Sequence, residues 1–114
     1  MNHAEIFVRF QAEGFHRWED APEGRSYLSS THRHIFHVEV RITTTHDDRE
    51  IEFHDLKDFC MMEFSEGDFG KMSCEMLARD LGEIVAFNYN RPVSVSVSED
   101  GECGAIVFIP KPAK

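Results

Sequence analysis

Apolar and polar residues alternate over two segments in the first part of the chain, residues 4–16 and residues 32–44. Even positions are largely apolar in the first segment, and the apolar residues from Phe36 to Ile42 are all even in the second. Side chains two residues apart on a strand point to the same face of a sheet. The pattern therefore predicts two strands, each with one covered side. Residues 17–31, which contain a cluster of turn-forming residues, are predicted to be a loop.

The spacing of apolar residues changes in the middle of the chain. Residues 50–53 could form a short strand, and a helical period then predicts a helix over residues 54–65. Glycine and acidic residues predict a turn over residues 65–70. Ser73 is suited to cap the N-terminus of a second helix, because its hydroxyl can accept a backbone N–H. An apolar stripe continues that helix until about residues 88–90.

Two more strands are predicted after the second helix. Valine and serine alternate from Pro92 to Ser98, and residues 105–109 are apolar. Asp100-Gly101 between them is typical of a tight hairpin turn. The predicted order is β-β-α-α-β-β, which favours an α+β fold with an antiparallel sheet and two helices on one face.

Composition narrows the class of protein. A chain of 114 residues fits one domain, residues 1–114. The net charge of −9 argues against nucleic-acid binding, which relies on Lys and Arg to neutralise phosphates. No apolar stretch is long enough to span a membrane, and the N-terminus lacks a basic and then apolar signal region, so we expect a cytoplasmic protein with no membrane partner.

The three cysteines are widely spaced at Cys60, Cys74 and Cys103, with no C-x-x-C pair. This spacing indicates neither a disulfide framework nor a four-cysteine zinc site. We expect reduced thiols, and the spacing leaves a catalytic thiol open.

Three histidines have the parity of the apolar faces: His16 ends the first predicted strand, and His32 and His34 begin the second. If no bulge intervenes, all three point to the covered side of one sheet. Three protein ligands with an open fourth position are typical of catalytic zinc. The alternative is that each histidine is hydrogen-bonded separately or exposed on a loop, and the pattern alone makes the two interpretations about equal.

Five short segments share residues with a known family in the same order along the chain. They are Phe10-Gln11-Ala12-Glu13-Gly14-Phe15-His16, His32-Arg33-His34-Ile35-Phe36, Glu52-Phe53-His54-Asp55-Leu56-Lys57, Met72-Ser73-Cys74-Glu75-Met76-Leu77-Ala78 and Val97-Ser98-Glu99-Asp100. Together they resemble the 6-pyruvoyl-tetrahydropterin synthase and 6-carboxytetrahydropterin synthase family. The resemblance covers most of the chain, and five ordered matches are more specific than any one of them.

The resemblance implies a tunnelling (T-) fold with Zn²⁺ held by His16, His32 and His34. It implies that Glu99 holds the ring of a pterin- or purine-like small molecule, although a glutamate before Asp-Gly can also be a solvated turn residue. It further implies a homo-oligomer, a trimer or hexamer. Imidazole ligands alone leave another divalent metal open.

The sequence departs from the family where catalysis takes place. The family cysteine four residues before the His-x-His motif is replaced by Leu28, and no Leu-Asp-His segment lies between the predicted helices. His37, His54 and Glu75 are candidate substitutes, and each can also be a solvated surface residue.

Three functions follow from these observations. The first is a zinc-dependent lyase or synthase that acts on a dihydroneopterin-like substrate, through polarisation of its side-chain oxygens. The second is a divergent protein that binds zinc and a pterin or purine without standard synthase activity. The third is a structural oligomer with no ligand. The loss of the family cysteine and of the Asp-His pair supports the second.

Overall fold

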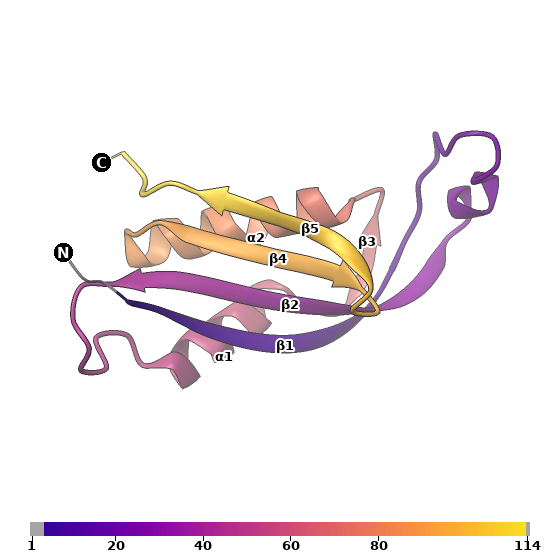
Figure 1. Ribbon diagram of the computed structural model, residues 1–114. Helices are drawn as coiled ribbons and strands as arrows, with labels where there is room; N and C mark the ends of the chain where they lie inside the picture. The colour runs from indigo at the N-terminus through magenta and orange to yellow at the C-terminus, as the bar shows by residue number, and fades with distance from the viewer. Residues whose placement is uncertain (1–3, 114) are drawn as a thin grey trace.

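One sheet and two helices make up the fold in the computed structural model, which describes residues 4–113 (Figure 1). The strands are β1 (Ala4–His16), β2 (His32–Thr44), β3 (Gly67–Gly70), β4 (Val93–Glu99) and β5 (Cys103–Ile109). The helices are α1 (Phe53–Glu63) and α2 (Cys74–Tyr89), with a 3-10 turn, η1, at Ser26–Ser29. The predicted domain covers residues 1–114, and the predicted lack of a signal region concerns the N-terminus. Residues 1–3 and residue 114 lie outside the described residues.

The predicted alternation is confirmed in β1, β2 and β4, and the apolar residues 105–109 lie in β5 as predicted. β1 pairs antiparallel with β2, β2 with β4, and β4 with β5. Even residues of β1 and β2 and odd residues of β4 and β5 point to the face that α1 and α2 cover (Figure 1). The core includes the fully buried residues Phe36, Val38, Val40, Ile42, Leu56, Cys60, Val85, Val95 and Val97. The α+β class with two helices on one face is therefore confirmed.

The sheet has a fifth strand that the sequence did not predict. β3 occupies part of the predicted turn at residues 65–70 and runs parallel to β1, so the sheet is mixed and not wholly antiparallel. Its sequence Gly-Asp-Phe-Gly has no alternation and low strand propensity. The ring of Phe69 packs against Phe36 and Phe64, and this tertiary contact holds the segment against β1.

The short strand predicted at residues 50–53 is wrong. Glu52 instead caps α1, because its carboxylate accepts the backbone N–H groups of His54 and Asp55. The Glu50 carboxylate accepts two hydrogen bonds from the Arg91 guanidinium, at 2.7 and 2.9 Å, and forms an ion pair with it. The local cap at Glu52 and the long-range ion pair of Glu50 with Arg91 therefore replace strand pairing in this segment.

The predicted boundaries of the second helix are confirmed. The Ser73 hydroxyl accepts the backbone N–H of Met76 at 3.1 Å, and Asn90 ends the helix in the left-handed conformation with φ of 59°. Asn tolerates this backbone region better than most residues. α2 packs on β4 and β5 and directs its N-terminus toward the end of the sheet where β4 stops (Figure 1).

The loop between β1 and β2 extends beyond the two layers, at one end of an elongated molecule measuring 49 × 25 × 24 Å (Figure 1). A hydrogen bond from the Trp18 N–H to the Leu28 carbonyl oxygen closes this loop near its base. Within residues 4–113, neither helix has the length and hydropathy needed to cross a membrane.

Candidate metal centre and adjoining pocket

The three predicted histidines meet where β1 ends and β2 begins. His16 and His32 are direct partners in the β1–β2 register, and His34 lies opposite Gly14. The ring centroids are 4.6 to 5.2 Å apart, and one nitrogen of each ring lies within 4.8 Å of the others. Strand alternation places all three rings on the covered face, so the parity argument correctly identified this cluster.

Each imidazole is oriented by an oxygen acceptor at its Nδ1 atom. His16 Nδ1 lies 3.0 Å from the Met72 carbonyl oxygen, and His32 Nδ1 lies 2.8 Å from the Ser30 carbonyl oxygen. His34 Nδ1 lies 2.7 Å from Asp100 Oδ2. We assign the ring proton to Nδ1 in all three, because each of these oxygens can only accept. Each Nε2 then carries a lone pair, as in metal-binding histidines whose other nitrogen donates to a second group.

The Nε2 atoms of His16 and His34 are buried and have no hydrogen-bond partner. A buried polar atom without a partner costs free energy, so such atoms are uncommon in native proteins. A divalent cation would accept both lone pairs and remove this cost. The donor set of neutral imidazoles fits Zn²⁺.

Two carboxylates that are adjacent in sequence lie near the two ring nitrogens of His34. Glu99 and Asp100 follow each other at the end of β4, where Glu99 Oε1 lies 3.6 Å from His34 Nε2 and Asp100 accepts at Nδ1. Asp100 Oδ1 also accepts the backbone N–H of Ile35 at 3.0 Å. That N–H group and the His34 ring both lower the pKa of Asp100, so it stays an ionised acceptor.

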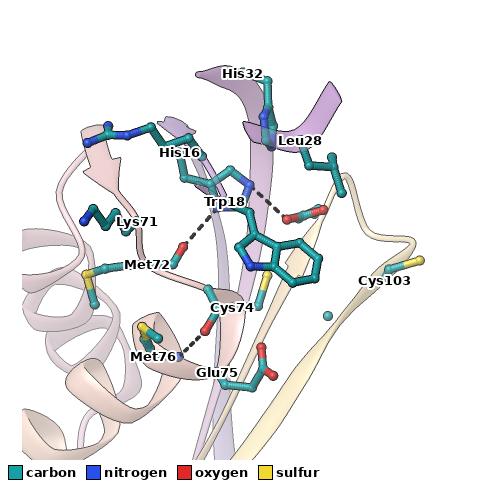
Figure 2. Close-up of a pocket in the computed structure, with 14 residues that line it drawn as sticks. His16, Trp18, Leu28, His32, Lys71, Met72, Cys74, Glu75, Met76 and Cys103 are labelled. Atoms are coloured by element: carbon teal, nitrogen blue, oxygen red, sulfur yellow. Dashed lines mark hydrogen bonds and ion pairs between the residues drawn. The ribbon is translucent and has the colours of Figure 1, made fainter. Parts of the chain in front are cut away.

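A hollow of about 410 Å³ adjoins the histidine cluster (Figure 2). Its wall combines the end of β1 and the following loop, the β3–α2 connection and the β4–β5 hairpin. The lining residues include His16, Trp18, Leu28, His32, Met72, Cys74, Glu75, Met76, Glu99 and Cys103. This volume lies in the range of small-molecule sites, and an apolar wall with a few polar groups is typical of them.

Two cationic side chains stand at the same hollow, although the chain is acidic overall. Lys71 Nζ lies 3.0 Å from Glu19 Oε2, and Arg17 Nε lies 3.1 Å from Glu19 Oε1. The ammonium of Lys71 and the guanidinium of Arg17 lower the pKa of Glu19. The cations therefore share one carboxylate.

Comparison with solved structures found chains with a similar fold. The 6-pyruvoyl tetrahydropterin synthase of Caenorhabditis elegans matches with a TM-score of 0.69 and 13% identity, over 96% of both chains. The enzyme of the same name from Plasmodium vivax, as a catalytic-residue mutant, matches with a TM-score of 0.66 and 15% identity, over 96% of this chain and 99% of that one. No protein-family model and no curated protein sequence matches this chain.

The fold is that of the 6-pyruvoyl tetrahydropterin synthases. The fold predicted from five short segments is confirmed, because the match spans nearly the whole chain. At these identities the likeness concerns the fold, and the roles of individual residues follow only from the geometry of this chain.

Of the three candidate substitutes for the catalytic groups, one lies at the pocket and two lie elsewhere. Leu28, at the position where the resemblance implied a cysteine, lines the pocket with an apolar side chain. Among the candidate substitutes, Glu75 also lines it. His37 lies on the opposite face of the sheet beside Gln11 and Ser98, and His54 is exposed on α1.

Two thiols line the same pocket and were not predicted as part of a site. Burial, with smaller contributions from Glu99 and Glu75, raises the pKa of Cys74 to about 12, which leaves it a thiol at neutral pH. Cys103 is exposed and lies opposite Glu99 in the β4–β5 register. The register of the predicted hairpin could have placed Cys103 beside Glu99.

Asp100 was also missed, because Asp-Gly reads as a turn and nothing in the spacing joins it to His34. The two residues are 66 positions apart and meet only through the pairing of β2 with β4.

Proposed function

We propose that this protein binds Zn²⁺ through His16, His32 and His34 and a pterin- or purine-like molecule in the adjoining pocket. The unpartnered Nε2 atoms of His16 and His34 carry the proposal, because they are oriented as ligands by oxygens on the far side of each ring. The likeness to solved 6-pyruvoyl tetrahydropterin synthases supports the class of ligand.

Glu99 is the proposed anchor of the ligand ring. Its carboxylate lines the pocket and is about one-third exposed, so it can reach a ligand while partly protected from water. Two N–H donors on one edge of a pterin would match the two carboxylate oxygens, and a charge-assisted pair of this kind is stronger than a neutral one.

If the protein is also an enzyme, the proposed reaction is a lyase or synthase reaction on a dihydroneopterin-like substrate. Zn²⁺ would supply Lewis-acid polarisation of side-chain oxygens of the substrate. A proton must then be removed from carbon, and Glu75, which lines the pocket together with Glu99, is the carboxylate proposed for this task. Leu28 cannot accept a proton, and Cys74 is a thiol at neutral pH because of its raised pKa.

We therefore expect Zn²⁺-loaded protein to convert dihydroneopterin triphosphate weakly or not at all, while it still binds the pterin ring. A general acid or base contributes roughly 10²–10⁴-fold to a rate, and the two such groups of the family pattern have no counterpart here. Product analysis by chromatography, with His34→Ala as the background, measures this. Robust turnover would show that Glu75, His37, His54 or another copy of the chain supplies the missing groups.

The Glu99→Ala variant is expected to bind dihydroneopterin about 10- to 100-fold more weakly, as expected for one lost charge-assisted interaction. The measurement is calorimetric titration of protein stripped of metal by a chelator, so that metal affinity does not enter. Quenching of Trp18, the sole tryptophan and a pocket residue, gives a second readout.

Glu102→Ala is the matched control, since Glu102 is exposed in the same hairpin and does not line the pocket. Equal affinity of the wild type and Glu99→Ala for dihydroneopterin would show that Glu99 does not bind the ligand ring.

A homo-oligomer, a trimer or hexamer, is proposed from the uncovered side of the sheet. There β5 presents Ile106 and Phe108, which are 63% and 77% exposed, on a strand paired on one side only. An edge strand with exposed apolar side chains is suited to association with another chain. Light scattering at micromolar concentration should give a mass of three or six times 13.2 kDa, and a monomeric mass would contradict the proposal.

A further inference from the structure

The Glu99 carboxylate lies close to two of the nitrogen atoms that are proposed to bind the metal. Its Oε2 atom is 3.0 Å from His16 Nε2, and its Oε1 atom is 3.6 Å from His34 Nε2. Neither contact has the geometry of a hydrogen bond, although both nitrogens are buried. The two oxygens of one carboxylate thus approach two different imidazoles.

These contacts are unfavourable without a positive charge between the groups. With each ring proton on Nδ1, the Nε2 lone pairs point toward an anionic carboxylate, and two electron-rich atoms then face each other. The side chain of His16 is 8% exposed, so water screens this contact poorly. A cation among the three groups would turn the repulsion into coordination.

The hairpin holds Glu99 in this position. Its neighbour Asp100 donates its backbone N–H to the Ile35 carbonyl oxygen at 2.7 Å, and Asp100 Oδ1 accepts the Ile35 N–H. These two bonds fasten the turn to β2, the strand that carries His34. The carboxylate is therefore pre-positioned by the backbone, which is the usual requirement for a precise metal ligand.

We propose that Glu99 is the fourth ligand of the metal held by His16, His32 and His34, and that it leaves the metal when a small molecule enters the pocket. The inference rests on the metal site proposed above. Donor atoms bound at about 2.0–2.1 Å to a tetrahedral zinc ion lie about 3.4 Å apart. Glu99 Oε2 is 3.0 Å from His16 Nε2 and Oε1 is 3.6 Å from His34 Nε2, so each oxygen is close to this spacing from one imidazole nitrogen.

A fourth protein ligand would close the coordination sphere of the metal while the pocket is empty. Zinc with four protein ligands is closed, whereas catalytic zinc keeps one position for water or substrate. The N–H edge of a pterin-like ring and the metal would compete for the same carboxylate. Ligand entry would then open the coordination position, so the metal is exposed only when the pocket is filled.

The affinity for Zn²⁺ and the visible absorption of the Co²⁺-loaded protein test this inference in the absence of any pterin. Chelator competition should give about 10- to 100-fold weaker Zn²⁺ binding for Glu99→Gln than for the wild type. The Co²⁺ bands should also weaken and shift, since four-coordinate Co²⁺ absorbs more strongly than five- or six-coordinate Co²⁺. Addition of dihydroneopterin to the wild type should produce the same direction of change.

Glu102→Gln is the control and should leave both quantities unchanged. Glu99→Ala, which removes the side chain, is the second variant, and circular dichroism verifies that each variant is folded. Unchanged Zn²⁺ affinity and Co²⁺ bands in both Glu99 variants would overturn the fourth-ligand role and leave the three-histidine site standing. Failure of the wild type to bind either metal would overturn the metal site and this inference together.

Discussion

The His34→Ala variant is expected to bind Zn²⁺ roughly 10²–10³-fold more weakly than the wild type. Structural zinc sites bind with about 10–16 kcal/mol, so one of four ligands corresponds to about 2.5–4 kcal/mol. The His34 ring lies 5.2 Å from that of His16 and 4.9 Å from that of His32, so its Nε2 can share a metal ion with both. Chelator competition with purified protein measures the change.

His37→Ala is the matched control for this experiment. His37 lies on the same strand three residues further along, and odd parity places it on the opposite face of the sheet. Its removal should leave the Zn²⁺ affinity unchanged. Equal affinities in His34→Ala and the wild type would mean that the three imidazoles do not form the metal site.

The Phe36→Ala variant is expected to lower the free energy of unfolding by about 3–5 kcal/mol. Phe36 is fully buried on the central strand β2, and its ring packs edge-on against Phe69, with centroids 5.3 Å apart. Truncation leaves a cavity that the neighbouring strands cannot fill by collapse. Urea denaturation monitored by circular dichroism measures the loss.

Phe53→Ala is a suitable comparison, because Phe53 is 51% exposed at the start of α1. Its replacement should cost at most about 1 kcal/mol. Similar losses in the two variants would indicate that the core is not organised around Phe36. The Phe36 ring also contacts His16 and His34 edge-on, so its loss should loosen the histidine cluster as well.

Much of the fold could be predicted because its long strands and helices are locally encoded. Alternation of apolar and polar residues in β1, β2 and β4 identified the faces of the sheet, and the Ser73 cap identified the start of α2. β3 could not be predicted, because its four residues pair with β1 through a tertiary contact of Phe69. The error at residues 50–53 has the same origin, since Glu50 is fixed by Arg91 from a distant helix end.

The histidine cluster could be predicted from parity, whereas its orienting groups could not. The Met72 carbonyl and the Asp100 carboxylate reach the rings from 56 and 66 residues away. Glu99 was assigned to the ligand ring from its odd parity, which it shares with the valines of β4, together with the family resemblance. Neither argument indicated that its carboxylate lies close to His16 Nε2. Contacts between groups far apart in sequence depend on exact sheet register, which alternation constrains only in part.

The pairing of His16 with His32 has a consequence for the loop between them. These residues close the two ends of the segment 17–31, and that segment carries Trp18 and Leu28 into the pocket wall. A metal bound by both histidines would link the two ends of this loop and reduce the conformational freedom of its pocket-lining residues. This shared ordering would favour binding of the metal and the small molecule together, and would act against their competition for Glu99.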